Sequence, residues 1–110
     1  MNLSEYQNHA ARTISNKITV QESCIHSLLG MAAEVGELTG IFQKNLQGHE
    51  LNHEHIIKEC GDILWMLAEF CTVSGISLET VAQTNIEKLR ARYPNGFDAE
   101  RSRNREANDI

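Results

Sequence analysis

The chain has 110 residues, of which 41% are apolar and 5% aromatic, and its formal net charge is −5. This length favours one domain with a single hydrophobic core. The acidic balance argues against a duplex nucleic acid partner, because contacts with phosphates dominate that affinity.

The composition favours helices. Ala, Leu, Ile and Glu are abundant, and Pro94 is the single proline. The first residues carry no basic-then-apolar signal, and no apolar run reaches membrane-spanning length, so we expect a cytoplasmic protein without membrane contact. The cysteines Cys24, Cys60 and Cys71 lack metal-site spacing, and we expect Cys60 and Cys71 to be buried, reduced thiols.

Capping signals predict four helices in chain order. A capping box at residues 4–7 should start the first helix, and a second box at residues 19–22 should start a long helix that stops near Gly48. Asn52 should cap a third helix that runs to Gly75. Ser77 should cap a fourth helix that ends before Pro94.

Short connections make sequential helices antiparallel, so we expect an all-α fold in which the protomer is an antiparallel four-helix bundle. Residues 1–97 should form this domain. Residues 98–110 are polar and should form a loosely packed tail or an arm that needs a partner. The long second helix is apolar on more than one side, which predicts a homo-oligomer of at least two chains.

Two segments carry matched pairs of acids. Glu34 and Glu37 in the second helix, and Glu59 and Asp62 in the third, each stand three residues apart with a glycine between them. Residues three apart share a helix face. A single pair of this kind is usually an ordinary solvated face, but these two pairs have apolar neighbours on both helices. Carboxylates gathered in such surroundings repel one another unless a cation neutralises them, which predicts a divalent metal site.

Four glycines stand inside the predicted helices, although glycine costs about 1 kcal/mol relative to alanine there. We expect either a close approach of helices that leaves room for ions and phosphates, or simple tight packing. The four are Gly30, Gly36, Gly40 and Gly61.

The acid motif, Glu34-x-x-Glu37 followed by Glu59-x-x-Asp62, resembles the MazG-like branch of the all-α nucleoside triphosphate pyrophosphohydrolases. The segment from Asn85 to Phe97, with Lys88 and the Arg92-Tyr93-Pro94 element, is similar to a later part of the same family. The resemblance extends from the second helix through Phe97.

This resemblance implies cleavage between the α- and β-phosphates of a nucleoside triphosphate, which releases a nucleoside monophosphate and pyrophosphate. It implies magnesium, with manganese as an alternative, held by all four acids, and a homodimer or homotetramer. One carboxylate, Glu34 or Glu37, would activate the attacking water. The candidates for contacts with the substrate phosphates are Lys44, Asn85, Lys88, Arg92 and Tyr93.

Other readings stay open. A phosphoribosyl-ATP pyrophosphohydrolase would use the same metal chemistry on another nucleotide, and a non-catalytic helical dimerisation module would need no matched acids. Histidines near residues 49–55 are expected in a solvated loop rather than at zinc, and Trp65 either stacks on a base or packs in the core. The arginines at 101, 103 and 105 are either a solvated tail or contacts for phosphates.

Overall fold

The computed structural model describes all 110 residues and contains helices without strands. The all-α prediction is therefore confirmed. Residues Met1–Ser77 and Leu78–Ile110 form two compact units. The four-helix bundle, and the division into a domain of residues 1–97 and a tail of residues 98–110, stay predictions. No single helix combines the length and the hydropathy needed to cross a membrane.

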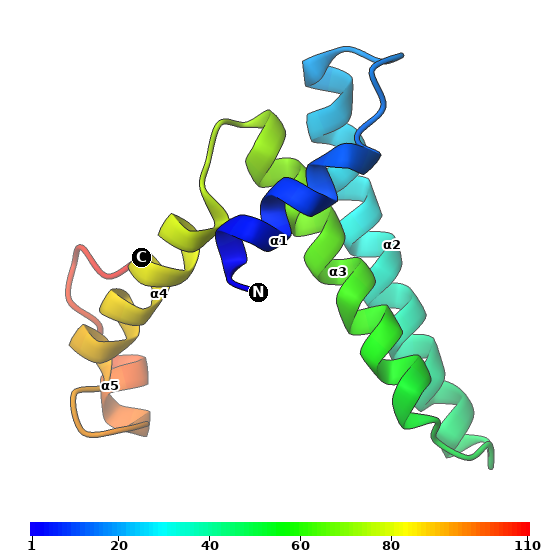
Figure 1. The fold of residues 1–110 in the computed structure, drawn as a ribbon. Helices are drawn as coiled ribbons and strands as arrows, with labels where there is room; N and C mark the ends of the chain where they lie inside the picture. Colours follow the sequence, from blue (N-terminus) through cyan, green and yellow to red (C-terminus); the bar gives the residue numbers. More distant parts are fainter. The chain divides into compact units, whose positions relative to one another are not determined.

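The first unit is built on a helical hairpin. Helix α2 (Val20–Leu46) packs along α3 (His53–Val73), and the two helices lie side by side in Figure 1. Helix α1 (Leu3–Ala10) and the 3-10 turn η1 (Ala11–Thr13) pack on α3. The side chain of Gln7 donates to the Thr72 hydroxyl and to the Ile76 carbonyl, which fixes α1 near the end of α3.

Local capping explains where these helices begin. Thr19 and Glu22 form the predicted capping box, and their hydrogen bonds lower the pKa of Glu22. Asn52 caps α3 as expected, by accepting from the backbone of His55. The prediction for α1 was wrong: Asn2 is the cap, and it exchanges hydrogen bonds with Glu5. Asparagine caps a helix as well as serine does, so the helix starts earlier.

The predicted ends of the second, third and fourth helices are confirmed within about two residues. Gly48 and Gly75 follow α2 and α3 with positive φ angles of 100° and 69°, which glycine adopts without a steric cost. Helix α4 (Leu78–Arg92) ends before Pro94. In the second unit, the predicted tail contains a further short helix, α5 (Ala99–Arg103), capped by Asp98.

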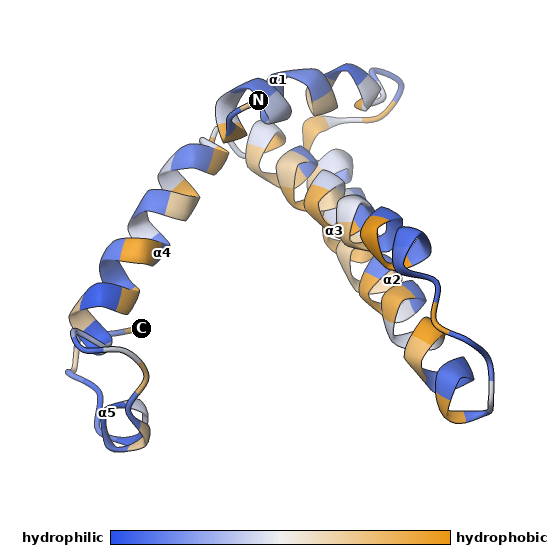
Figure 2. Ribbon diagram, turned by 60° about the horizontal axis from the view of Figure 1, so that its bottom comes forward, coloured by the Kyte–Doolittle hydropathy of each residue, from blue (hydrophilic) through white to orange (hydrophobic).

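The buried core of the hairpin is small. Among its apolar residues only Met66, Ala68 and Cys71, all on α3, are buried. Cys60 is exposed, so the prediction that it is buried was wrong. Neighbouring residues on a helix point about 100° apart, so Cys60 turns outward where Glu59 turns inward. Apolar segments recur along α2 and α3, whereas α5 is mainly hydrophilic (Figure 2).

Close helix approach is found at one of the four helical glycines. A Cβ atom at Gly30 would collide with the sulfur and Cγ of the buried Met66. The absence of a side chain at Gly30 therefore lets α3 pack closely on α2. Gly36, Gly40 and Gly61 have open space where a Cβ would stand. Their place in the helices is not explained by contacts within the chain.

We therefore expect alanine to have opposite effects at two glycines of α2. Gly30→Ala should lower the free energy of unfolding by about 1–3 kcal/mol, because Met66 must move within a packed interface. Gly40→Ala, the matched control, should raise it by up to about 1 kcal/mol through helix propensity. Urea titration followed by circular dichroism measures both changes. Stabilisation by Gly30→Ala would contradict the close contact.

Candidate active site

Three of the four predicted acids converge across the hairpin. Glu34 of α2 and both acids of the α3 pair, Glu59 and Asp62, offer carboxylate oxygens that lie within 4.8 Å of one another. All three side chains are half-buried. The i, i+3 spacing places the α3 pair on one face, and packing against α2 brings Glu34 to that face. We call this group the acid cluster.

The acid cluster is electrostatically crowded. Burial raises the pKa of Glu34 above its ordinary value, and the negative charges of Asp62, Glu59 and Glu37 add to the rise. A hydrogen bond with Glu59 acts in the same direction. The rise favours the protonated form of Glu34, which reduces repulsion between the carboxylates. A hard divalent cation would replace that proton and relieve the same repulsion more completely.

Glu37 occupies a different position from the other acids. It is exposed, and it is not a member of the acid cluster. Its charge nevertheless reaches Glu34, one helical turn earlier, since it contributes to the raised pKa there. Glu37 therefore lies at the edge of the cluster, and its predicted role as a fourth metal ligand stays a prediction.

Two residues without a predicted role at the site support the cluster. The expectation of a solvated loop was wrong for His53 and His55, because α3 already begins at His53. His55 stands one turn before Glu59, and its Nε2 lies 3.0 Å from the Glu59 Oε1 atom. Tyr6 of α1 lies close enough to Asp62 for that charge, after burial, to raise the tyrosine pKa. The i, i+4 spacing of His55 and Glu59 was visible in the sequence. The approach of Tyr6 depends on how α1 packs and had no local signal.

A further buried acid, also missed, bridges the hairpin. The Glu69 side chain is only 5% exposed, and its Oε2 lies 2.7 Å from His26 Nδ1 on α2. Buried carboxylates need such a partner because they lose their hydration. Glu69 follows Asp62 by two helical turns, so its spacing was the available signal. This pair ties α2 to α3 beyond the acid cluster.

The remaining aromatic and histidine candidates are not part of the acid cluster. The Trp65 indole N–H donates to the Thr13 hydroxyl at 2.7 Å, which anchors η1 on α3. His49 and His53 are exposed, and no histidine joins the group that could hold a metal.

The predicted phosphate contacts lie elsewhere along the chain. Lys44 is exposed in the last turn of α2, roughly 15 Å along the helix from Glu34. Asn85 is exposed on α4, while Lys88, Arg92 and Tyr93 are half-buried in the second unit. Arg92 pairs with Asp109 and also lies 5.7 Å from the centre of the Tyr93 ring. Their roles toward a substrate stay predictions.

Comparison with known proteins identifies the family. The MazG nucleotide pyrophosphohydrolase domain matches residues 21–97, which is most of the chain. The chain belongs to the MazG nucleotide pyrophosphohydrolase family. It is also similar to the Gene 37 protein of Mycobacterium phage L5, with 28% identity over 80 residues that cover 68% of this chain and 70% of the phage protein. No solved structure gives a significant match.

The MazG domain includes the acid cluster, Glu37 and the whole of α4. It leaves out α1 and α5. Tyr6, which approaches Asp62, therefore comes from outside the matched segment, and so does every residue after Phe97.

The raised pKa of Glu34 predicts how stability depends on pH without metal. The protonated carboxyl contributes stability that is fully present below its ordinary pKa of 4.5 and is lost as the pH rises through the raised value in the folded protein. Glu34→Gln cannot ionise, so the metal-free variant should melt above the wild type at pH 7 and lose that advantage near pH 4.

Thermal melts at both pH values, with EDTA, measure this difference. Glu54→Gln removes an exposed α3 carboxylate that pairs with Lys58 and serves as the control, which should show no such gain at pH 7. Saturating magnesium should reverse the order, because a ligand that binds only the folded wild type stabilises it. Equal melting of wild type and Glu34→Gln at pH 7 without metal would contradict the crowding.

Proposed function

We propose that the chain hydrolyses nucleoside triphosphates between the α- and β-phosphates and releases a nucleoside monophosphate and pyrophosphate. The observation that carries this proposal is the acid cluster, in which carboxylate oxygens from two helices lie within 4.8 Å of one another. Membership of the MazG family supports the reaction class. The cluster supports a nucleotide that arrives with a metal, since an acidic site repels free phosphates.

The donor set fits magnesium. Its members are hard carboxylate oxygens, and the charge repulsion that raises the pKa of Glu34 is the property a divalent cation would relieve. Glu34, Glu59 and Asp62 would hold the ion, and Glu37 would stand beside it without binding it directly. When bound, the ion would supply charge neutralisation of the triphosphate and polarisation of the scissile phosphoryl group.

The chain's own groups divide the remaining work. Glu37 is exposed and outside the cluster, so its carboxylate is available to orient or deprotonate the attacking water. We therefore favour Glu37 over Glu34 for that role. His55 orients Glu59 through its hydrogen bond, which limits the rotamers of the carboxylate. Lys44, Asn85, Lys88, Arg92 and Tyr93 are the proposed contacts for phosphate oxygens.

The reaction is tested by product analysis. Wild-type protein with magnesium and a panel of nucleoside triphosphates should yield monophosphate and pyrophosphate in equal amounts, resolved by ion chromatography. Asp62→Asn should lower kcat by at least about a hundredfold, because it weakens a ligand of a hard cation. Glu54→Gln, with the same charge change on α3, should keep wild-type kcat. A contaminating phosphatase would instead leave both variants at the wild-type rate. Release of orthophosphate and a diphosphate would overturn the proposal.

We also propose that the protein is a homo-oligomer. The outer side of α2 carries large apolar residues that are all more than 40% exposed, at Ile25, Leu28, Leu29, Val35, Phe42 and Leu46. On a helical wheel this stripe is centred roughly 140° from Glu34. An apolar stripe of this length is typical of an interface rather than of a free surface. A four-helix arrangement within the protomer belongs to the same proposal.

A single charge in the stripe should disrupt the oligomer. Val35 and Leu51 are 48% and 47% exposed, so Asp at each position changes a similar surface. Val35→Asp should lower the mass measured by light scattering at micromolar concentration, because the carboxylate would be desolvated in the interface. Leu51→Asp, in the loop after α2, should keep the wild-type mass. A wild-type monomer in this assay would contradict the proposal.

A further inference from the structure

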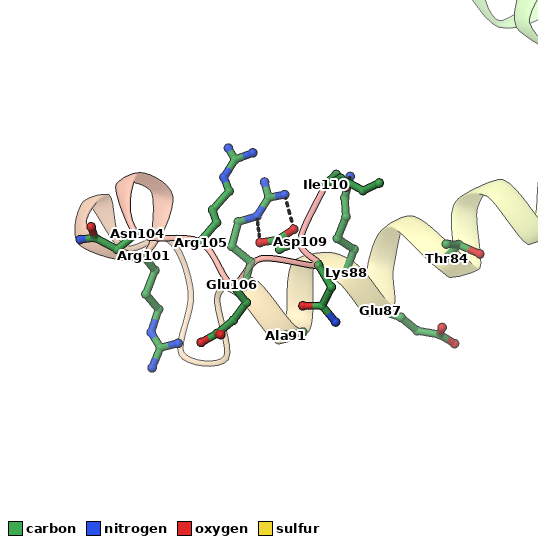
Figure 3. A pocket seen from close by; sticks show the side chains of 12 residues that line it. Thr84, Glu87, Lys88, Ala91, Arg101, Asn104, Arg105, Glu106, Asp109 and Ile110 are labelled. Carbon is green, nitrogen blue, oxygen red and sulfur yellow. Dashed lines mark hydrogen bonds and ion pairs between the residues drawn. The ribbon is translucent and has the colours of Figure 1, made fainter.

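The C-terminal segment folds back on α4 through one short, double contact. The Arg92 guanidinium donates from Nε to Oδ2 of Asp109 at 2.7 Å and from Nη2 to Oδ1 at 2.6 Å. The two side chains are only 10% and 13% exposed. Figure 3 shows both bonds beside α4. This fork-to-fork geometry is the one in which arginine binds a carboxylate or a phosphate.

Asp109 faces more than one cation. Its pKa is lowered by the hydrogen bond and the charge of Arg92, and also by the charges of Arg105 and Lys88. The Lys88 ammonium donates to the Ile110 carbonyl oxygen at 3.0 Å. We call Lys88, Arg92 and Arg105 the cation cluster. The one side-chain carboxylate of Asp109 therefore faces three cationic side chains. A ligand with more negative charge, such as a polyphosphate, would neutralise these cations more completely.

The cation cluster lines a pocket of about 480 Å³, a size that admits small molecules. Glu87 and Glu106 also line this pocket. In Figure 3 their side chains point away from the side on which Asp109, Lys88 and Arg105 lie. Asp109 is thus the acid that meets the cations, and it occupies the position that an anionic ligand would take.

We propose that Asp109 is an internal competitor for polyphosphate, so that binding of a triphosphate or pyrophosphate to Lys88, Arg92 and Arg105 displaces residues 108–110 from these cations. This inference rests on the proposed function for the identity of the anion. Arg105 and Asp109 follow the MazG domain, which ends at residue 97, so this competition is a feature added to the domain by the chain that follows it. Because residues 108–110 must be displaced before the anion binds, the competition would lower the affinity for substrate and for the pyrophosphate product alike.

The test uses the full chain, with inorganic pyrophosphate and a non-hydrolysable nucleoside triphosphate as probes in calorimetry. Asp109→Asn keeps the shape of the side chain and removes its charge. It should bind both probes at least about fivefold more tightly than the wild type and lower KM without lowering kcat. Glu100→Gln makes the same charge change on α5, outside the pocket lining, and should leave affinity unchanged. Arg105→Gln should weaken binding of both probes.

A purely structural ion pair predicts the opposite result. In that case Asp109→Asn would lower the melting temperature and leave affinity unchanged or weaker, which overturns the proposal. A measurement on the wild type covers the case in which the variant does not fold: pyrophosphate should speed hydrogen exchange of the amides at residues 108–110. Protection of these amides by pyrophosphate would likewise overturn it.

The two proposals fail in different ways. Hydrolysis of triphosphates with the same KM and pyrophosphate affinity in wild type and Asp109→Asn would overturn the competition and leave the proposed function intact. Tighter pyrophosphate binding by Asp109→Asn, with no hydrolysis by either protein, would support the competition and overturn the proposed function.

Discussion

Repulsion among carboxylates across the α2–α3 hairpin is the constraint on which the site depends. Glu34, Glu59 and Asp62 are held together although their charges oppose it, and the raised pKa of Glu34 records the cost. The hairpin withstands this repulsion through contacts toward the start of α2 and the end of α3, namely the approach of Met66 to Gly30 and the pairing of buried Glu69 with His26. A rigid frame that concentrates negative charge is suited to a cation, since the free energy lost in the empty site is recovered when the ion binds.

The same hairpin leaves most of its apolar surface uncovered. Its buried apolar core is confined to three α3 side chains, while α2 exposes a stripe on the side roughly opposite Glu34. Helix α2 therefore has two distinct faces. One carries Glu34 of the acid cluster, and the other is apolar and would suit an apolar partner surface. An interface on the outer face would stiffen α2, and with it the position of Glu34, because a long helix transmits the restraint along its axis.

In the second unit, cationic side chains that could bind phosphates are already paired with groups of the same unit. Arg92 and Lys88, which the family resemblance connects with phosphates, are here engaged by Asp109 and the Ile110 carbonyl. Tyr93 packs against Phe97, with ring centres 5.4 Å apart, and its pKa is lowered by a hydrogen bond with Ser102 and by the nearby arginines. These contacts order the segment after Pro94, so the cations have defined positions before any anion binds.

The sequence by itself determined the helices and the chemistry of the acids. The Thr19–Glu22 box, the Asn52 cap and the glycines after α2 and α3 act through neighbours in the chain, so they could be predicted, and the i, i+3 spacing of each acid pair follows from helix geometry alone. The predicted cap at Ser4 was wrong because Asn2, which suits that position equally well, lies earlier in the chain. Only the tertiary structure separated Glu37 from the other three acids, buried Glu69 beside His26, turned Cys60 outward and joined Arg92 to Asp109. Those outcomes depend on how each helix is rotated against its neighbour. Packing among residues that are distant in the sequence fixes this rotation, and no local sequence pattern encodes it.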